Sequence, residues 1–179
     1  MEEKDILNKL LNPETKDYGF NLLVSHFQKR VYLLARKMVI DHEDANDITQ
    51  DVFIKVYQNI EKFRGHSTLF TWIYRITSNE CISFLRKRKI RSFLPWSDSS
   101  DALELQIDNS PLISGDDIQK KLQKAILTLP DKQRLVFNLK YFDELKYEEI
   151  AKITGTSIGS LKASYHLAVK KIEQFLNND

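Results

Sequence analysis

A row of side chains in residues 44–55 could do chemistry together, because their spacing places them on one face of a helix. Asp44, Asp47, Asp51 and Lys55 recur at intervals of three and four residues, which stacks them along one side. A row of carboxylates could bind a divalent metal ion, yet no histidine or further acidic cluster completes a ligand set. Acid–base catalysis is also disfavoured, because these carboxylates would be solvated. A solvated face and a docking surface for a protein both remain open.

The cysteine and the histidines give no sign of catalysis or of a cofactor. Cys81 is the single cysteine of the chain, and the four histidines show no metal-ligand spacing with it. We expect Cys81 to be a small core residue, because no nearby base marks it as a nucleophile. The chain is therefore predicted to be no enzyme and to hold no metal or cofactor. A metal-dependent enzyme that uses the aspartates above is the weakest alternative.

Another set of side chains could bind single-stranded DNA. On a helix that begins at Leu69, one arc is apolar, and the far side carries hydroxyl, amide and basic groups: Thr71, Arg75, Ser78, Asn79 and Arg86. Trp72 lies on the border, where it could stack on a base or be a half-buried core residue. In the preceding loop, residues 64–68, Gly65 allows an extruded base to approach the backbone. Glu80 falls inside the apolar arc without explanation.

Residues 147–176 indicate a helix-turn-helix. Each half carries an apolar stripe at helical spacing, so two helices must pack face to face. Gly155 suits the positive φ of the turn, and Ser157 suits the N-cap of the second helix. The other side of that helix is small and basic, which fits a DNA groove and its phosphates. An ordinary helical hairpin with a solvated lysine face is the alternative.

The elements that must position these residues are helices. With only five glycines and four prolines, the chain predicts an all-α protein of two small helical domains joined by a flexible linker. The expected helices are 3–11, 18–39, 44–62, 69–90, 117–128, 131–141, 147–153 and 157–176. The expected domains are 1–92 and 118–179, and residues 93–117, rich in serine and interrupted by proline, form the linker.

Charge separates the same parts of the chain. Residues 1–92 and residues 118–179 each carry a net charge of +4, whereas residues 93–117 carry −6. Two basic domains suit a polyanionic partner. No apolar run approaches the roughly 20 residues of a membrane span, and no leader peptide is recognisable. We therefore expect a cytoplasmic protein without membrane insertion.

Together these features resemble the extracytoplasmic-function sigma factors, the two-domain promoter-recognition subunits of bacterial RNA polymerase. The resemblance covers about residues 20–91 and 118–176 and rests on linked motifs in the family's order. These are D-A-x-D-x-x-Q-x-x-F-x-K-x-Y at 44–57, F-R-G-x-S-x-x-x-T-W-x-Y-R-I at 63–76, L-P-x-x-x-R-x-V-F-x-L at 129–139 and Y-E-E-I-A at 147–151.

The resemblance implies a role for each set of residues. The residues that would face the clamp helices of the polymerase β′ subunit are Asp47, Gln50, Asp51 and Lys55. The pocket for a flipped base of the promoter −10 element would be Arg64, Gly65, His66, Ser67 and Thr68, and the melted strand would pass Trp72, Arg75 and Asn79. The residues that would read the −35 element are Lys162, Ala163, Ser164, His166 and Lys170. The β flap of the polymerase and an anti-sigma factor are further implied partners.

Departures from the family's pattern bear on the helix-turn-helix. Glu144-Leu-Lys146 stands where relatives commonly have glycine and a hydroxyl residue, and the lost N-cap costs about 1 kcal/mol unless Asp143 or another group replaces it. The second helix also lacks the arginines often found there, so arginine cannot read guanine at those positions. A stand-alone helix-turn-helix regulator with a helical dimerisation domain is the alternative function.

Overall fold

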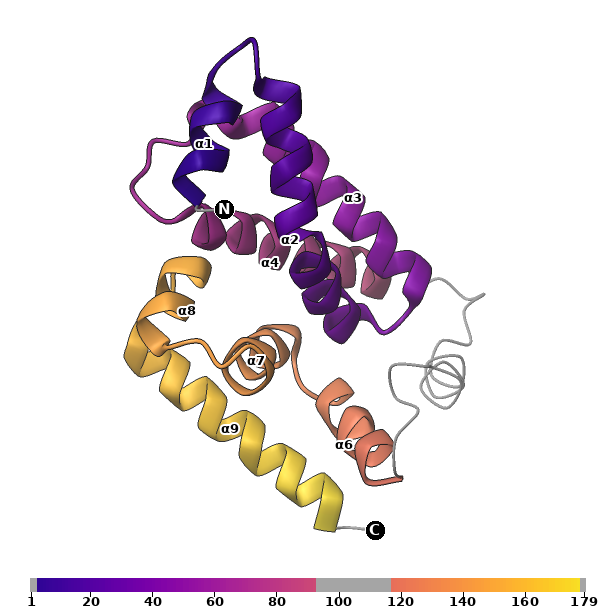
Figure 1. The fold of residues 1–179 in the computed structure, drawn as a ribbon. Coiled ribbons are helices and arrows are strands. Elements are labelled where there is room, and N and C mark those ends of the chain that lie inside the picture. Colours follow the sequence, from indigo (N-terminus) through magenta and orange to yellow (C-terminus); the bar gives the residue numbers. More distant parts are fainter. Residues whose placement is uncertain (1–2, 93–116, 178–179) are drawn as a thin grey trace.

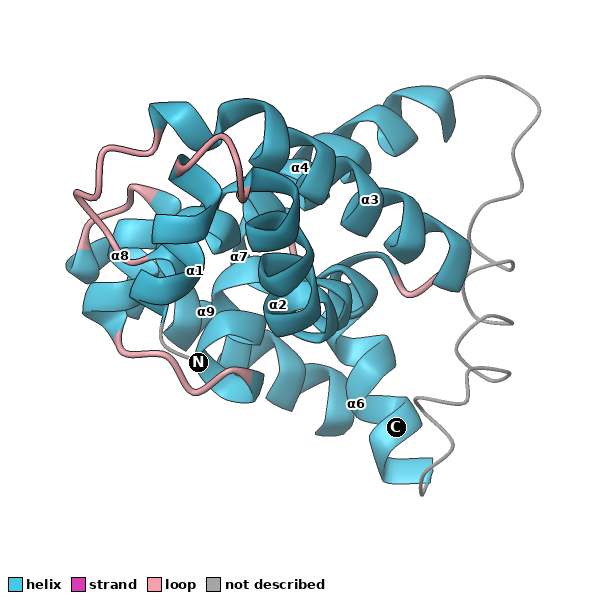
Figure 2. Ribbon diagram, turned by 45° about the horizontal axis from the view of Figure 1, so that its top comes forward, coloured by secondary structure: helices cyan, strands magenta, loops and turns pink. Residues whose placement is uncertain are grey.

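A computed structural model describes residues 3–92 and 117–177 of the chain. Within these ranges the protein consists of helices and connecting turns without strands, as Figure 2 shows, which confirms the predicted all-α class. Of the predicted linker, residues 93–116 lie outside the described residues, and Asp117 is the first residue of a helix. No described helix has both the length and the apolar character needed to cross a membrane.

The N-terminal helical region contains a long helix, residues 69–92, that crosses two others (Figure 1). Its elements are α1 (Glu3–Leu11), α2 (Lys16–Val39), α3 (His42–Asn59), a 3₁₀ turn (Ile60–Lys62) and α4 (Leu69–Ser92). On α4, Leu69, Ile73, Cys81 and Leu85 are buried, and at about 100° per residue they spread over roughly 160° of one side of the helix. That side packs against α2 and α3.

The C-terminal helical region is smaller and ends in a long helix. Its elements are α6 (Asp117–Leu127), α7 (Asp131–Phe137), a π-helical turn (Asn138–Phe142), α8 (Tyr147–Thr154) and α9 (Ile158–Asn177). Helix α9 packs along α6, α7 and α8. A small apolar core lies between these helices and contains Ala125, Ile126, Leu129, Phe137, Ala168 and Ile172.

Local sequence signals set the turn of the helix-turn-helix as predicted. Gly155 has φ +69° and its N–H donates to the carbonyl of Ala151, which ends α8. The hydroxyl of Ser157 accepts a hydrogen bond of 3.3 Å from the N–H of Ser160, so Ser157 caps α9. Both predictions for this turn are confirmed, because both depend on contacts within a few residues of the chain.

At the start of α8 the N-cap residue Lys146 makes no side-chain cap hydrogen bond, and only the reciprocal half of a capping box is present. The carboxylate of Glu149 accepts a hydrogen bond of 2.9 Å from the N–H of Lys146, which is half of a capping box. Asp143 instead forms an ion pair of 3.2 Å with Lys37 of α2. Glu144 has φ +53°, a conformation that glycine adopts without strain.

The two helical regions share one apolar core. Side chains of the C-terminal region join the core of α1–α4, and they are Leu135, Val136, Leu139, Ile150, Ile153 and Leu161. Helix α4 lies at this junction: it contacts α2 and α3 in its own region and α7 and α8 in the other. The C-terminal region thus packs against the N-terminal region, and we call this the closed arrangement. No local sequence pattern predicted it.

Close backbone packing holds α1 in place. A Cβ atom added to Gly19 of α2 would lie 2.7 Å from the nitrogen of Leu10 and 2.8 Å from the carbonyl carbon of Lys9. The hydroxyl of Thr15 also donates to the carbonyl of Lys9 at 2.9 Å. Glycine at position 19 therefore lets α1 and α2 approach more closely than any other residue would.

We expect Gly19→Ala to lower the free energy of unfolding by about 1–3 kcal/mol, because backbone atoms must move to admit the methyl group. Gly159→Ala is the matched control, since a Cβ there meets nothing within 4 Å. That change should raise stability by up to about 1 kcal/mol through helix propensity. Urea denaturation measures both variants, and shifts of the same sign would contradict this account.

Candidate nucleic-acid interface

One edge of α4 carries the side chains that the sequence assigned to single-stranded DNA. Arg75 and Asn79 are exposed, and Trp72 is half-buried. The Trp72 ring packs against Phe63 with 5.2 Å between ring centroids. Trp72 is therefore part of the packing, as the alternative interpretation had it, and it still offers part of its surface to a partner.

Two residues that the sequence placed on this exposed edge are buried. Thr71 is 5% exposed and Ser78 is 2% exposed. The prediction was wrong here because α4 is covered from two sides. Helices α7 and α8, which pack on its second side, belong to the C-terminal half of the chain and could not be placed there from the local sequence. Arg75, Asn79 and Arg86 of the same predicted face do remain exposed.

A groove of about 350 Å³ lies between α3 and α4 beside this edge. Its lining is aromatic, amide and charged, and consists of Lys55, Asn59, Lys62, Trp72, Ile76, Asn79 and Glu80. Lys55 forms an ion pair with Glu80. This partner explains why an acidic residue stands within the apolar arc of α4. Asn59 and Lys62 were missed, although their spacing from Lys55 by four and seven residues indicated one shared helix face.

The predicted base-capture loop, residues 64–68, joins the 3₁₀ turn to α4. Gly65 has φ +70°, and Arg64 and His66 are exposed. The hydroxyl of Thr68 accepts a hydrogen bond of 3.1 Å from the N–H of Thr71, so Thr68 caps α4. The loop thus combines an exposed basic tip with a fixed C-terminal end.

The open face of α9 displays most of the predicted duplex-reading residues. Lys162, Ala163, His166 and Lys170 are exposed, and Ser164 is half-buried. The ammonium of Lys162 lies 5.9 Å from the centroid of the Tyr147 ring, a distance at which a cation–π contact holds the side chain beside the start of α8. The buried stripe of α9 packs on α8 and α7, so this basic face points outward.

The acidic face of α3 is open in its middle and occupied at its start. Asp47, Gln50 and Asp51 are exposed, whereas Asp44 lies 3.5 Å from the guanidinium of Arg88. Burial raises the pKa of Asp44, with Asp41 adding to that rise and Arg88 opposing it. No group of three or more His, Cys, Asp or Glu in the described ranges could hold a metal ion.

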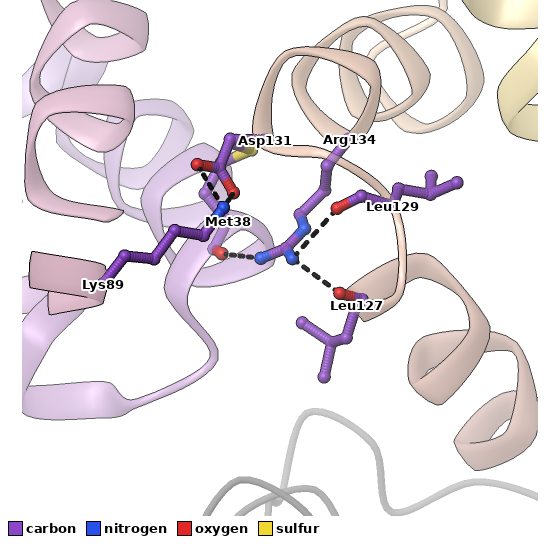
Figure 3. A network of polar contacts seen from close by, with 6 residues as sticks. All are labelled: Met38, Lys89, Leu127, Leu129, Asp131 and Arg134. Atoms are coloured by element: carbon purple, nitrogen blue, oxygen red, sulfur yellow. Dashed lines mark hydrogen bonds and ion pairs between the residues drawn. The ribbon is translucent and has the colours of Figure 1, made fainter. Parts of the chain in front are cut away.

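A buried arginine connects the two helical regions (Figure 3). Arg134 of α7 is 8% exposed, and its guanidinium donates to the carbonyl of Met38 in α2 at 2.9 Å. The same group donates to the carbonyls of Leu127 and Leu129 at 2.7 and 3.3 Å. Burial lowers the pKa of Arg134, and the charge of nearby Asp131 opposes that shift. Arg134 therefore ties the turn before α7 to the end of α2.

Further contacts close the same junction. Asp131 forms an ion pair of 2.9 Å with Lys89 of α4, and Asn138 donates to the carbonyl of Lys37 at 3.4 Å. Arg75, from the predicted DNA-binding edge, donates to the carbonyl of Lys152 in α8. In this closed arrangement the guanidinium of Arg75, which the sequence assigned to the melted strand, is therefore bound to α8.

A second groove, of about 340 Å³, follows the junction. It is lined by α4, α7, the end of α8 and the turn after it, through Ser78, Asn79, Ile82, Ser83, Arg86, Lys132, Leu135, Val136, Thr154 and Thr156. Asn79 lines both grooves. The exposed edge of α4 is thus bordered by α3 on one side and by the C-terminal region on the other.

Cys81 lies in the core, as predicted. Its side chain is fully buried, and burial raises the pKa of the thiol to about 12. The group is protonated at neutral pH, which leaves it a poor nucleophile.

Comparison with known proteins identifies both helical regions. Residues 23–91 match the family model for sigma-70 region 2, and residues 119–172 match that for sigma-70 region 4. Two regions of this kind in one chain define an RNA polymerase sigma factor.

The relatives narrow this class. The chain is 33% identical to the ECF RNA polymerase sigma factor SigW of Bacillus subtilis over 156 residues, covering 83% of each protein. It is 32% identical to the ECF RNA polymerase sigma-E factor of Escherichia coli over 166 residues, covering 87% of this chain and 85% of the relative. The chain belongs to the extracytoplasmic-function (ECF) sigma factors, as the resemblance implied.

Solved structures share the fold across both regions. The sigma factor RpoE in complex with the anti-sigma factor NepR from Bartonella quintana matches with a TM-score of 0.71 and 24% identity, over 89% of this chain and 98% of that one. CnrH in complex with the cytosolic domain of CnrY matches with a TM-score of 0.69 and 18% identity, over 99% of this chain and 96% of that one.

Arg134→Met should weaken the junction, because the apolar stem is retained while the carbonyls of Met38, Leu127 and Leu129 lose their donor. We expect the free energy of unfolding to fall by about 2–4 kcal/mol. Arg86→Met, at an exposed position of α4, is the control and should change it by less than about 0.5 kcal/mol. Chemical denaturation followed by circular dichroism gives both values; a midpoint unchanged by Arg134→Met would refute the assigned role.

Proposed function

We propose that the chain directs core RNA polymerase to specific promoters, with α9 reading the −35 element and the α4 edge and its loop capturing the melted −10 element. The observation that carries this proposal is the presence, in one ECF sigma factor chain, of two different exposed surfaces whose side chains suit DNA. One is a basic helix face suited to a duplex groove, and the other is an aromatic and basic edge suited to unpaired bases. RNA synthesis itself belongs to the polymerase, so the chain needs no catalytic residue or cofactor.

At the −35 element, α9 would lie in the major groove. Its exposed contacts would be Lys162, Ala163, Ser164, His166 and Lys170. Lysines in this set fit phosphates and guanine edges, while the small Ala163 permits close approach to base edges. Helix α8 supports α9 from behind through the packed stripe and the turn at Gly155.

At the −10 element, the loop of residues 64–68 would accept a flipped base. The strand beside that base would pass Trp72, Arg75 and Asn79 on α4, and the groove between α3 and α4 offers room for a second unstacked base. Stacking on an aromatic ring stabilises an unpaired base by about 1–3 kcal/mol. This edge would therefore favour the separated strands over the duplex.

The exposed acidic face of α3 would dock on the polymerase. Asp47, Gln50 and Asp51 would face the β′ clamp helices, with Lys55 at the border between this face and the −10 groove. The C-terminal region would meet the β flap. Docking residues and DNA-binding residues would thus occupy neighbouring faces of the same helical region.

The closed arrangement would have to open on a promoter. The −35 and −10 elements lie about 25 base pairs apart, which is roughly 85 Å at 3.4 Å per base pair. A packed body of this size has a radius of gyration of only about 16 Å. The two helical regions cannot reach both elements while α8 packs on α4, so we infer that residues 93–117 act as the tether during separation.

An anti-sigma factor is a fitting inhibitor. The similar sigma factor RpoE of Bartonella quintana was solved in complex with the anti-sigma factor NepR. We infer that such a partner would hold this chain closed, in the cytoplasm where polymerase and promoter DNA are found. The alternative, a stand-alone regulator with a helical dimerisation domain, is not favoured, because its N-terminal part would not be a sigma region 2.

Run-off transcription with purified core polymerase and a genomic promoter library tests the proposal. We expect defined start sites that require both the chain and the core enzyme. A gel-shift experiment without core enzyme addresses the alternative regulator, which would bind a palindromic duplex by itself. Absence of any chain-dependent product, while a known sigma factor works in parallel, would refute the proposed function.

Asp47→Arg should weaken binding to core polymerase by about tenfold, because it reverses the charge of an exposed side chain on the face that is proposed to dock on the β′ clamp helices. Glu14→Arg reverses another exposed acid of the same region and should leave the affinity unchanged. Fluorescence anisotropy of the labelled chain titrated with core enzyme measures both. An effect of equal size in the two variants would point to net charge and not to this docking face.

A further inference from the structure

Helix α1 has no part in the function described so far. The match to sigma region 2 begins at residue 23, so α1 lies ahead of it in the chain. Nevertheless, α1 is firmly docked: Ile6 and Leu10 are each 1% exposed, and its C-terminal end is held by Gly19 and Thr15. A helix fixed so firmly at one end can hold a side chain in place at the other.

That side chain is Glu3, in the first turn of α1. Its carboxylate accepts a hydrogen bond of 3.1 Å from the N–H of Leu69, the first residue of α4. The first N–H groups of a helix have no partner within the helix, and a negative charge there is favoured by the helix dipole. Thr68 caps the same end through the N–H of Thr71, so a local and a distant residue together satisfy this terminus.

The base-capture loop lies between two elements that α1 contacts. Residues 64–68 follow the 3₁₀ turn Ile60–Lys62, against which α1 packs, and they precede Leu69, which Glu3 binds. Arg64, Gly65 and His66 in the loop are exposed. The packed neighbours at its two ends therefore limit where the loop can lie.

We infer that α1 positions the base-capture loop, and that Glu3 is the positioning residue that fixes the loop relative to α4. The inference rests on the proposed function, in which this loop receives a flipped base. Glu3 touches no DNA in this scheme; it acts by holding the N-terminus of α4 at the place where the pocket closes.

Binding of single-stranded DNA to the holoenzyme tests this role. The probe is a labelled oligonucleotide with the −10 non-template sequence of a promoter that the native holoenzyme uses. A second probe carries an abasic site at the position whose base contributes most to native binding. We expect Glu3→Ala to weaken binding of the first probe by about three- to tenfold and to leave binding of the abasic probe equal to that of the native holoenzyme.

Conservative variants separate positioning from folding. Glu3→Gln keeps an acceptor oxygen and should restore most of the affinity. The side chain in Glu3→Asp is too short to reach Leu69, so this variant should bind the intact probe as weakly as Glu3→Ala. It replaces Glu3→Ala in the test if the alanine variant folds poorly. Asp5→Ala, at an exposed site on the same helix, is the control and should bind like the native chain. Affinity for core enzyme and the melting temperature are measured on the same samples.

Two results would overturn the inference while leaving the proposed function intact. Native-like binding of the intact probe by both Glu3→Ala and Glu3→Asp would show that the contact does not matter. A loss that persists on the abasic probe would show that the contact supports the fold alone. If the native holoenzyme binds neither probe and starts no transcription, the proposed function fails, and this inference fails with it.

Discussion

Helix α4 packs against both helical regions and still leaves one edge exposed to solvent. The rest of the structure depends on that constraint. Its apolar side is covered by α2 and α3, while α7 and α8 cover a second side. A helix buried from two directions has few positions left for polar function, so Arg75, Asn79 and Arg86 are confined to a narrow strip. Small hydroxyl residues, Thr71 and Ser78, occupy the flanks that become buried.

Buried polar contacts hold the junction in one specific arrangement. Apolar packing alone is non-directional, whereas the guanidinium of Arg134 has a fixed geometry and donates to carbonyls of both regions. Burying this charge costs free energy, which its hydrogen bonds to the three carbonyls offset. If the interface opens, the guanidinium of Arg134 and the carbonyl of Met38 lose the hydrogen bond between them, so we infer that opening requires new contacts with polymerase, DNA or water.

The helices and the helix-turn-helix could be predicted because their determinants are local. Apolar spacing, Gly155 and Ser157 act within one or two turns, and the predicted helices agree with the structure to within a few residues. Features that depend on distant residues were missed. Glu80 had no explanation until Lys55 of another helix was seen beside it, and burial of Ser78 needed a partner from the far end of the chain. The closed arrangement was missed for the same reason, because it depends on contacts between residues that are distant in the sequence.

The buried position of Cys81 has a practical consequence for testing whether the two regions separate. The only native sulfhydryl stays protonated and shielded inside the N-terminal core, where alkylating or dye reagents in water cannot reach it while the chain is folded. A cysteine introduced on the surface of each region would then carry a label without interference from the native residue. Fluorophore pairs attached in this way would report the distance between α4 and α9 in the free chain, on polymerase and on DNA.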